Sequence, residues 1–488
     1  MKKILLCLLL IFSLNALLGQ APKREMRATW IATVDNIDWP LKGRSLPREQ
    51  QADLIAILDN VVANNLNSVA FQIRPTADAF YRSDHEPWSH WLTGTQGLAP
   101  AYDPLEFLIA ECDRRGIAVH VWINPYRVWL NDENLSPALR ATLARRYPGW
   151  MVQYGTTHYL QPADDRSREH IVRVVADIVR KYDIDAVHID DYFYPYRIAG
   201  QEFPDDSYFR ASPRGFTDKG DWRRDNVDRI IRQIGDTIHS LKPWVEFGIS
   251  PFGVWRNASR DPRGSATRAG QTNYDDLYAD ILKWEREGWV DYVSPQLYWS
   301  IGDTAADYKT LAQWWNDNAF GTPVYIGHAL YRVDPRSSTA AWRTAQEIVR
   351  QITLNRTLPA IRGSFLYSAK FLAQSDIQSA LRQVYPSRAL WPINPRIAPI
   401  LPAPPGSPRL ITVAGETFIE WQPEQDNRRF VIYRFPAGAE PDFENPATIL
   451  AITGASRFIL PAPPRPGDRF FVSSLSLTHH ESAPVECL

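Results

Sequence analysis

The sequence predicts an α/β fold, a (β/α)8 TIM barrel, followed by a small all-β sandwich domain. Between residues 26 and 385, eight apolar segments rich in β-branched residues alternate with amphipathic helical segments, which is the pattern of such a barrel. A proline-dense stretch follows, and about 80 further residues alternate apolar and polar side chains with period two, as sandwich strands do. The 488 residues also exceed what one hydrophobic core usually organises.

We expect the chain to divide into a signal peptide at 1–20, the barrel at 21–388, a linker at 389–407 and the sandwich at 408–488. The linker is expected to be semi-rigid because it holds many prolines. The sandwich resembles a fibronectin type III module, with Trp421 as its core tryptophan. We expect this module to act as a spacer or to dock onto a protein partner of the cell envelope.

The first 20 residues have the composition of a secretory signal. Lys2 and Lys3 form a basic start, residues 4–14 are apolar, and small residues flank Gln20. The apolar run is shorter than the roughly 18 residues that a membrane-spanning helix needs, and Cys7 lies inside it rather than at the cleavage site. We therefore expect Sec-type export to the periplasm or the extracellular space, not as a lipoprotein and with no integral membrane segment after signal cleavage.

Charge and aromatic content limit the classes of ligand that the protein is expected to bind. The formal net charge is −1 at pH 7, and the basic residues are spread along the chain rather than gathered in an arm, which argues against nucleic acid as a partner. The chain holds 18 Trp, 21 Tyr and 20 Phe. This surplus predicts a surface that binds flat, weakly polar ligands such as the sugar rings of a glycan.

The eight strands are expected at 27–34, 68–74, 118–124, 186–190, 246–251, 290–298, 323–330 and 361–368. The competing fold, an open doubly wound sheet, would carry a glycine-rich phosphate-binding turn after its first strand, and this sequence has none there. The loops after strands two, three and four are enlarged, at 75–100, 125–161 and 192–221. All three leave the C-terminal ends of strands, which is the face where barrels hold their active sites.

Two adjacent carboxylates end the fourth expected strand. Asp190 and Asp191 follow the apolar run 186–189, and such a pair would pay a large desolvation cost in a packed core. Because side chains alternate along a strand, we expect His188 and Asp190 to share one face and Asp191 to point the other way. Glycoside hydrolysis needs two carboxyl groups, so the catalytic partner of Asp190 is Asp191, if a bulge realigns it, or a loop carboxyl such as Asp78.

Other polar and aromatic residues stand at or near the strand ends on the same rim. We expect them to orient the hydroxyl and acetamido groups of the substrate; they are Trp30, Arg74, Asn124, Tyr126, His188, Tyr192, Ser250, Gln296, Tyr298, Trp299, His328 and Tyr367. Arg74 has an alternative role as the ion-pair partner of Asp190. No catalytic metal is expected, because barrel metallohydrolases draw histidines from the first strand, where this chain has Thr29 and Trp30. No other cofactor is expected.

Several motifs together resemble one known family. They include Ala28-Thr29-Trp30, Gln72-Ile73-Arg74-Pro75, Trp122-Ile123-Asn124-Pro125-Tyr126, His188-Ile189-Asp190-Asp191-Tyr192, Ser250-Pro251-Phe252-Gly253 and Ser294-Pro295-Gln296-Leu297-Tyr298-Trp299. Their order resembles the glycosyl-hydrolase-like 10 family of exported bacterial proteins. The resemblance implies a barrel glycosidase, and the family includes a divisome-localised member that cleaves peptidoglycan strands stripped of their peptides. The fourth-strand segment is also similar to chitinase-type barrels, but Tyr192 stands where those have the proton-donating glutamate.

The predicted function is therefore hydrolysis of glycosidic bonds in a bacterial cell-wall glycan, above all peptide-free (denuded) peptidoglycan. Two alternatives stay open. One is a non-catalytic cell-wall glycan-binding protein built on the same barrel. The other is a secreted glycosidase that acts on another polysaccharide.

Overall fold

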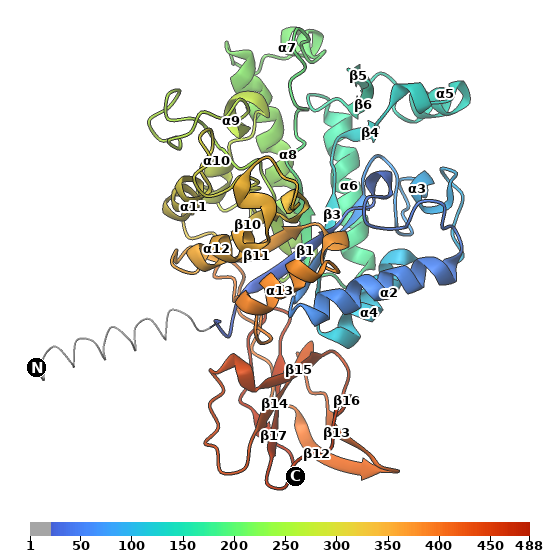
Figure 1. The fold of residues 1–488 in the computed structure, drawn as a ribbon. Helices are drawn as coiled ribbons and strands as arrows, with labels where there is room; N and C mark the ends of the chain where they lie inside the picture. Colours follow the sequence, from blue (N-terminus) through green and yellow to red (C-terminus); the bar gives the residue numbers. More distant parts are fainter. Residues whose placement is uncertain (1–20) are drawn as a thin grey trace, which may run out of the picture.

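The computed structural model describes residues 21–488 and contains the predicted barrel. In this part of the chain, eight parallel strands close into a ring in the order β1-β11-β10-β9-β8-β7-β3-β2 (Figure 1). Their bounds are Met26–Ile31 (β1), Ser68–Arg74 (β2), Ala118–Ile123 (β3), Ala186–Ile189 (β7), Glu246–Ile249 (β8), Tyr292–Val293 (β9), Val324–Ala329 (β10) and Ile361–Tyr367 (β11). The predicted signal peptide, residues 1–20, lies outside the described residues.

Helices surround the ring. The outer helices are α2 (Pro47–Ala63), α4 (Pro104–Arg115), α6 (Asp165–Lys181), α8 (Lys219–Leu241), α10 (Ile281–Arg286), α11 (Tyr308–Asp317), α12 (Gln346–Asn355) and α13 (Ser375–Val384). Aspartate side chains cap the N-termini of α4, α6 and α8, which satisfies backbone N–H groups that a helix start leaves free. Among residues 21–488, no helix is both long and apolar enough to cross a membrane.

Short helices occupy the connecting loops. The α-helical ones are α3 (His90–Thr93), α5 (Pro137–Arg146), α7 (Asp206–Ala211) and α9 (Asn273–Asp276). The 3-10 helices are η1 (Val34–Asn36), η2 (Asp132–Asn134), η3 (Leu330–Arg332), η4 (Ala340–Arg343), η5 (Ala369–Phe371) and η6 (Pro446–Thr448).

Strand β9 is much shorter than the nine residues expected at 290–298. It contains Tyr292–Val293, because Pro295 has no backbone N–H to offer to a ladder. Isolated bridges from Gln296 to Phe252 and Gly327 keep the following segment attached to its neighbours. This irregular segment carries Gln296 and Trp299 to the mouth of the barrel.

The barrel interior below the mouth is packed with rings. The His188 ring centroid lies 5.5 Å from that of Phe365 and 6.0 Å from that of Tyr292. Burial lowers the pKa of His188 well below its usual value, so this imidazole is neutral. Gly248 leaves the space that the Tyr292 ring fills, since a Cβ at that position would overlap the ring. A ligand therefore binds above this layer, among the loops at the strand ends.

The enlarged loops lie where they were predicted, at the C-terminal ends of β2, β3 and β7 (Figure 1). The loop after β3 contains a small antiparallel sheet in the order β4-β6-β5, formed by β4 (Arg127–Trp129), β5 (Met151–Tyr154) and β6 (Thr157–Leu160). This sheet fixes the position of Arg127, the first residue of β4, above the rim.

The C-terminal region is the predicted β-sandwich. One antiparallel sheet contains β12 (Gly406–Val413), β13 (Glu416–Gln422) and β16 (Arg457–Ile459), and the other contains β14 (Arg429–Phe435), β15 (Ile449–Thr453), β17 (Arg469–Leu475) and β18 (Val485–Glu486). Trp421 of one sheet and Phe430 of the other belong to the core between them. The likeness to a fibronectin type III module stays a prediction.

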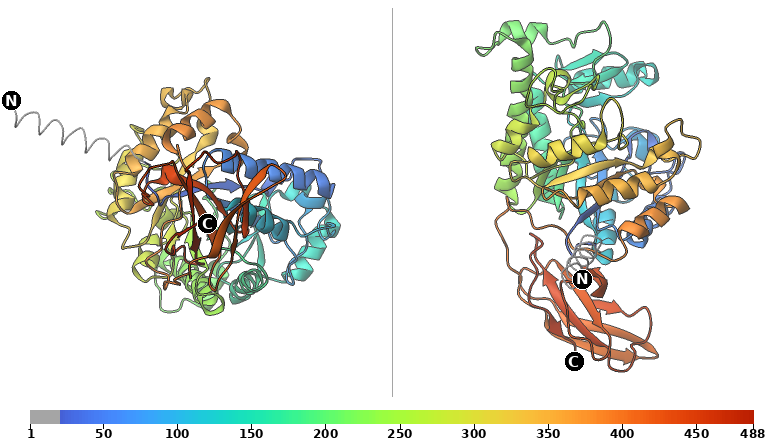
Figure 2. Two further views of the ribbon diagram at one scale, coloured as in Figure 1. Left: turned by 90° about the horizontal axis from the view of Figure 1, so that it is seen from below. Right: turned by 60° about the vertical axis from the view of Figure 1, so that its left-hand side comes forward.

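The sandwich packs against the N-terminal ends of the barrel strands, on the side away from the enlarged loops (Figures 1 and 2). Arg429 of β14 donates hydrogen bonds of 2.8 Å to both carboxylate oxygens of Asp185, the residue before β7. Trp391, in the segment predicted as linker, is buried, donates to Ser68 Oγ at 2.9 Å and stacks on His479. The start of that segment is thus part of the contact between the barrel and the sandwich.

Candidate active site

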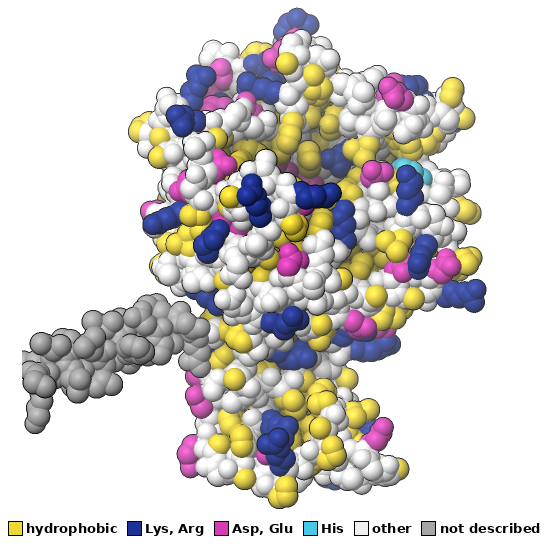
Figure 3. Space-filling model, viewed as in Figure 1, with side chains coloured by type: hydrophobic (Ala, Val, Ile, Leu, Met, Phe, Trp, Pro, Cys, Tyr) yellow, Lys and Arg dark blue, Asp and Glu magenta, His cyan; other side chains and the backbone are white. Residues whose placement is uncertain are grey.

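A cleft of about 550 Å³ opens at the C-terminal ends of the barrel strands. Figure 3 shows a hollow between the upper loops and the rim, with many hydrophobic side chains on its surface. Its aromatic lining consists of Trp30, Trp122, Tyr192, Tyr196, Phe252, Tyr298, Trp299, Tyr331 and Tyr367. Its polar and charged lining includes Asp35, Gln72, Arg127, Asp190, Asp191, Ser250, Gln296 and Arg332. Rings and polar groups in this mixture suit a carbohydrate, which presents both apolar faces and hydroxyl edges.

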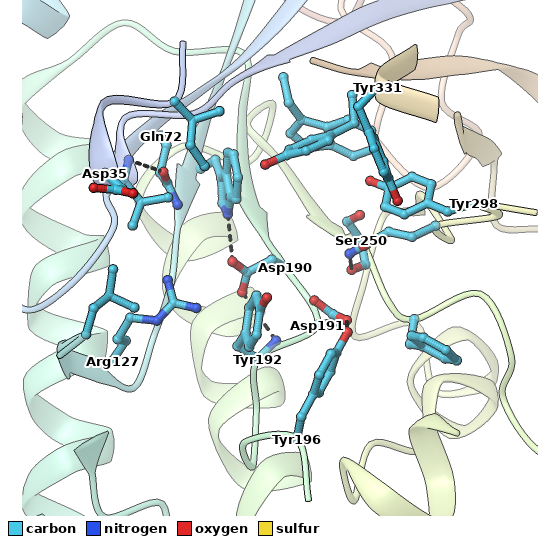
Figure 4. A pocket seen from close by; sticks show the side chains of 18 of the residues that line it. Asp35, Gln72, Arg127, Asp190, Asp191, Tyr192, Tyr196, Ser250, Tyr298 and Tyr331 are labelled. Carbon is cyan, nitrogen blue, oxygen red and sulfur yellow. Dashed lines mark hydrogen bonds between the residues drawn. The ribbon is translucent and has the colours of Figure 1, made fainter. Parts of the chain in front are cut away.

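Both adjacent carboxylates line the cleft (Figure 4). This differs from the divergence expected of neighbouring strand residues. Strand β7 ends at Ile189, so the alternation of a strand does not extend to Asp190 and Asp191. No separate bulge is needed to bring the second carboxyl group to the same space.

Asp190 is surrounded by hydrogen-bond donors. Trp122 Nε1 donates to it at 3.0 Å, and Asn124 Nδ2 lies 3.3 Å from both carboxylate oxygens. The backbone N–H of Tyr192 adds a bond of 3.3 Å. Burial raises the pKa of Asp190, whereas the charge of Arg127 and these donors oppose that rise. Donors of this kind stabilise the ionised carboxylate.

Asp191 accepts fewer hydrogen bonds than Asp190. Burial and the neighbouring charge of Asp190 raise its pKa to about 7. The Tyr196 hydroxyl donates to its Oδ2 and works against this rise. The two carboxyl groups share one cleft: the donors and Arg127 favour the ionised form of Asp190, whereas burial and the charge of Asp190 favour the protonated form of Asp191. This difference makes Asp191 the better candidate for the proton donor that the sequence alone left unassigned.

Removing the Tyr196 hydroxyl is expected to shift the pH dependence of activity. Phenylalanine at this position deletes the bond that favours ionised Asp191, so the pKa of Asp191 rises by about one unit, the size of one hydrogen bond to a charged group. Since the proton donor acts only when protonated, the alkaline limb of kcat/KM moves from near pH 7 to higher pH in the Tyr196→Phe variant. A pH–rate profile measures this, and an alkaline limb that moves to lower pH would contradict the assignment.

Of the predicted binding residues, seven line the cleft: Trp30, Tyr192, Ser250, Gln296, Tyr298, Trp299 and Tyr367. Two other predicted binding residues do not line the cleft but form hydrogen bonds with residues that do. Asn124 holds Asp190, and His188 Nε2 accepts a hydrogen bond of 3.1 Å from Trp30 Nε1, which orients that indole at the cleft wall.

Four predicted site residues lie elsewhere. Arg74 is fully buried and donates to Glu86 at 2.7 and 2.6 Å, not to Asp190. Although burial opposes ionisation, Arg74 and His170 lower the pKa of Glu86 to about 2, so this is a structural ion pair. Asp78 is also buried; its Oδ1 accepts from Thr76 Oγ1 at 2.9 Å, and it does not line the cleft.

Tyr126 and His328 are buried in the protein body as well. His328 Nδ1 and Nε2 lie 2.9 Å from Gln351 Oε1 and Ser364 Oγ, and burial lowers its pKa to about 4. Both residues follow or belong to strands, but their side chains point into packing rather than into the mouth.

Sequence reasoning missed several lining residues, chiefly Gln72, Trp122 and Arg127. Trp122 lies two residues before Asn124, so strand alternation could have placed both on the inner face. No pattern in the sequence could have placed Arg127 in the cleft, because its position depends on the small sheet inserted after β3. Among residues 21–488, no group of three or more His, Cys, Asp or Glu residues has the arrangement of a metal site.

Glycoside hydrolases built on a closed parallel barrel place carboxyl groups in a ring-lined cleft at the strand ends, and this chain has the same arrangement. A family model described as "Glycosyl hydrolase-like 10" matches residues 25–344, and the chain belongs to this family.

Similar proteins carry related names. "Glycosyl hydrolase YngK" of Bacillus subtilis (strain 168) is 47% identical over 388 residues, which are 78% of this chain and 76% of that protein. "Glycosyl hydrolase DigH" of Escherichia coli (strain K12) is 37% identical over 383 residues, 74% of this chain and 87% of that protein. Among solved structures, the PgaB (BpsB) glycoside hydrolase domain from Bordetella bronchiseptica aligns with a TM-score of 0.47 and 13% identity, covering 74% of this chain and 99% of that domain.

Proposed function

We propose that this protein is an exported glycosidase that hydrolyses peptide-free peptidoglycan in the bacterial cell envelope. The observation that carries the proposal is the pair Asp190 and Asp191, which share one ring-lined cleft in which Asp190 accepts several hydrogen bonds and the pKa of Asp191 is raised to about 7. The signal-like start of the sequence supports export. The family resemblance supports a peptidoglycan strand without peptides as the substrate.

In the proposed reaction, Asp191 protonates the glycosidic oxygen of the leaving sugar. The two carboxyl groups come from neighbouring residues at one strand end, so they approach the sugar from nearby positions rather than from its opposite faces. The attacking group is then the substrate's own 2-acetamido oxygen, which bonds to C1 as the C1–O bond to the leaving sugar breaks. The ionised Asp190 accepts a hydrogen bond from the acetamido N–H and stabilises the positive charge that develops on this group.

Hydrolysis of the cyclic intermediate completes the reaction. Water attacks C1, its proton passes to the now ionised Asp191, and the acetamido group is restored. Two successive displacements at C1 leave the configuration of the product unchanged. The proposed mechanism therefore predicts retention and a requirement for N-acetylated sugars.

The test uses murein sacculi from which an amidase has removed the peptides. Wild-type protein is expected to release soluble fragments with new reducing ends, detected by borohydride reduction and mass spectrometry, whereas Asp190→Asn releases none. Asp236→Asn is the matched control, because Asp236 is exposed on α8 far from the cleft lining. Binding to sacculi without fragments from any form would support the glycan-binding alternative. Release from other polysaccharides alone would support a different substrate.

A further inference from the structure

Arg127 differs from the other buried arginines of residues 21–488. The buried set is Arg27, Arg74, Arg127, Arg223 and Arg429. Arg27, Arg74, Arg223 and Arg429 form ion pairs with Glu25, Glu86, Asp205 and Asp185, respectively. Within the described residues Arg127 forms no ion pair, and its guanidinium donates one long hydrogen bond, from Nη1 to the Pro75 carbonyl at 3.4 Å.

The guanidinium of Arg127 faces the cleft. The residue is 7% exposed, and its guanidinium carbon lies 4.5 Å from the centre of the Tyr192 ring. Figure 4 shows it on the wall opposite Tyr298, with Asp190 between them. Burying a guanidinium without a carboxylate partner is costly. The charge of Arg127 acts on Asp190, but no carboxylate of residues 21–488 forms an ion pair with the guanidinium, and a bound ligand could supply one.

A second donor on the same wall also lacks a partner. Gln72 Oε1 accepts from the backbone N–H groups of Thr33 and Val34 at 3.0 and 2.9 Å, which assigns the oxygen and leaves Nε2 as the free end. Gln72 Nε2 is buried, has no hydrogen-bond partner and belongs to a residue that lines the cleft. The remaining cleft carboxylate, Asp35, is exposed and does not pair with Arg127.

We propose that Arg127 and Gln72 bind the lactyl carboxylate of N-acetylmuramic acid and so select glycan strands from which the peptides have been removed. This inference rests on the proposed function. In intact peptidoglycan the lactyl group forms an amide with the peptide and carries no charge. Removal of the peptide leaves a carboxylate, which a planar guanidinium binds through two parallel hydrogen bonds. Uronic acids carry the same chemical group, so the test includes them.

The experiment compares three substrates for the wild-type protein: denuded glycan strands, the same strands with their carboxylates converted to methylamides, and a polymer that alternates N-acetylhexosamine with a uronic acid. We expect kcat/KM for the free acid to exceed that for the methylamide by about 10- to 100-fold, the range that hydrogen bonds to a charged group provide. The uronic acid polymer is expected to be a poor substrate.

Two variants test whether the preference for the free acid over the methylamide depends on Arg127 and Gln72. In Arg127→Gln the preference for the free acid over the methylamide is expected to disappear; the ratio cancels any general effect of Arg127 on Asp190. Gln72→Glu keeps an acceptor for Thr33 and Val34 but places a carboxylate in the cleft, so it should lower activity on the free acid more than on the methylamide. Arg145→Gln, on the exposed surface of α5, serves as the matched control and should keep the wild-type ratio.

Equal cleavage of free acid and methylamide by the wild-type protein would overturn the inference while leaving the proposed function intact. Preferential cleavage of the uronic acid polymer would overturn it as well, since the carboxylate would then come from another sugar. Cleavage of neither murein strand would overturn the proposed function itself. If the wild-type protein prefers the free acid to the methylamide and Arg127→Gln keeps this preference, then Arg127 is not the source of the discrimination between the two substrates.

Discussion

Replacing Asp191 with asparagine is expected to lower kcat/KM for glycan hydrolysis by about 10²–10⁴-fold, the usual contribution of a positioned proton donor. Asparagine keeps the size of the side chain but has no proton to give to the leaving oxygen. An aryl glycoside with a dinitrophenolate leaving group needs little protonation, so Asp191→Asn should retain most of its kcat/KM on that substrate, while kcat falls because the water that attacks the intermediate has lost its base. Asp190→Asn should be impaired on both. Near-wild-type hydrolysis of denuded glycan by Asp191→Asn would contradict the assigned role.

The same variant is expected to be more stable than the wild type above neutral pH. The pKa of Asp191 rises from an ordinary value of 3.8 to about 7 in the folded protein, so between these values the folded state binds a proton that the unfolded state lacks. Stability of the wild type therefore falls as pH rises from about 4 to 7. Asparagine has no such loss. Urea unfolding at pH 8 measures the difference and also shows that lost activity does not reflect lost folding.

The second large effect is a loss of stability, expected when Arg429 is replaced at the contact between the barrel and the sandwich. In Arg429→Met the buried Asp185 carboxylate loses both of its 2.8 Å hydrogen bonds from the guanidinium. Leaving one member of a buried ion pair uncompensated costs about 3–5 kcal/mol. Because β7 begins directly after Asp185 and the proposed catalytic pair follows its other end, we expect the sandwich to stabilise the strand that positions this pair.

A double-mutant cycle tests this coupling. Asp185→Asn in the Arg429→Met background removes the orphaned charge but still accepts the backbone N–H of Val119, which donates to Asp185 at 2.7 Å, so much of the lost stability should return. The exposed pair Arg469 and Glu486 provides the control, since Arg469→Met should change the free energy of unfolding by less than about 1 kcal/mol. Equal urea midpoints for Arg429→Met and Arg469→Met would refute a bracing role.

The architecture could be predicted because its signals are local. Buried strands appear in the sequence as apolar runs, and amphipathic helices have apolar residues at intervals of three and four. The error at β9 has an equally local cause, since Pro295 ends the ladder that the apolar content of 290–298 suggested. The alternating pattern of apolar and polar residues also predicted the sandwich. Its contact with the barrel could not be predicted in this way, because the Asp185–Arg429 pair joins residues 244 positions apart and no local pattern links them.

The site was harder to predict because it depends on where each strand ends and which way each loop turns. Asp190 was placed at the mouth by its position after β7, whereas the orientation of Asp191 depended on the strand ending at Ile189. Arg74 and Asp78 carry suitable chemistry, but Glu86 and tight packing hold them outside the cleft. Gln72 and Arg127 were recognised only in the structure, where, among the residues it describes, Gln72 Nε2 has no hydrogen-bond partner and the Arg127 guanidinium donates one long hydrogen bond.

Titration of the Asp191 carboxyl group determines whether this residue holds a proton at neutral pH, as a proton donor must. In protein labelled with ¹³C at aspartate carboxyl carbons, the Asp191 signal is assigned by its absence from Asp191→Asn, and its chemical shift is followed from pH 3 to 9. We expect a midpoint near pH 7 that coincides with the alkaline limb of kcat/KM for glycan hydrolysis. A midpoint near the ordinary aspartate value of about 4 would contradict it, because Asp191 would then be ionised at neutral pH and unable to donate a proton.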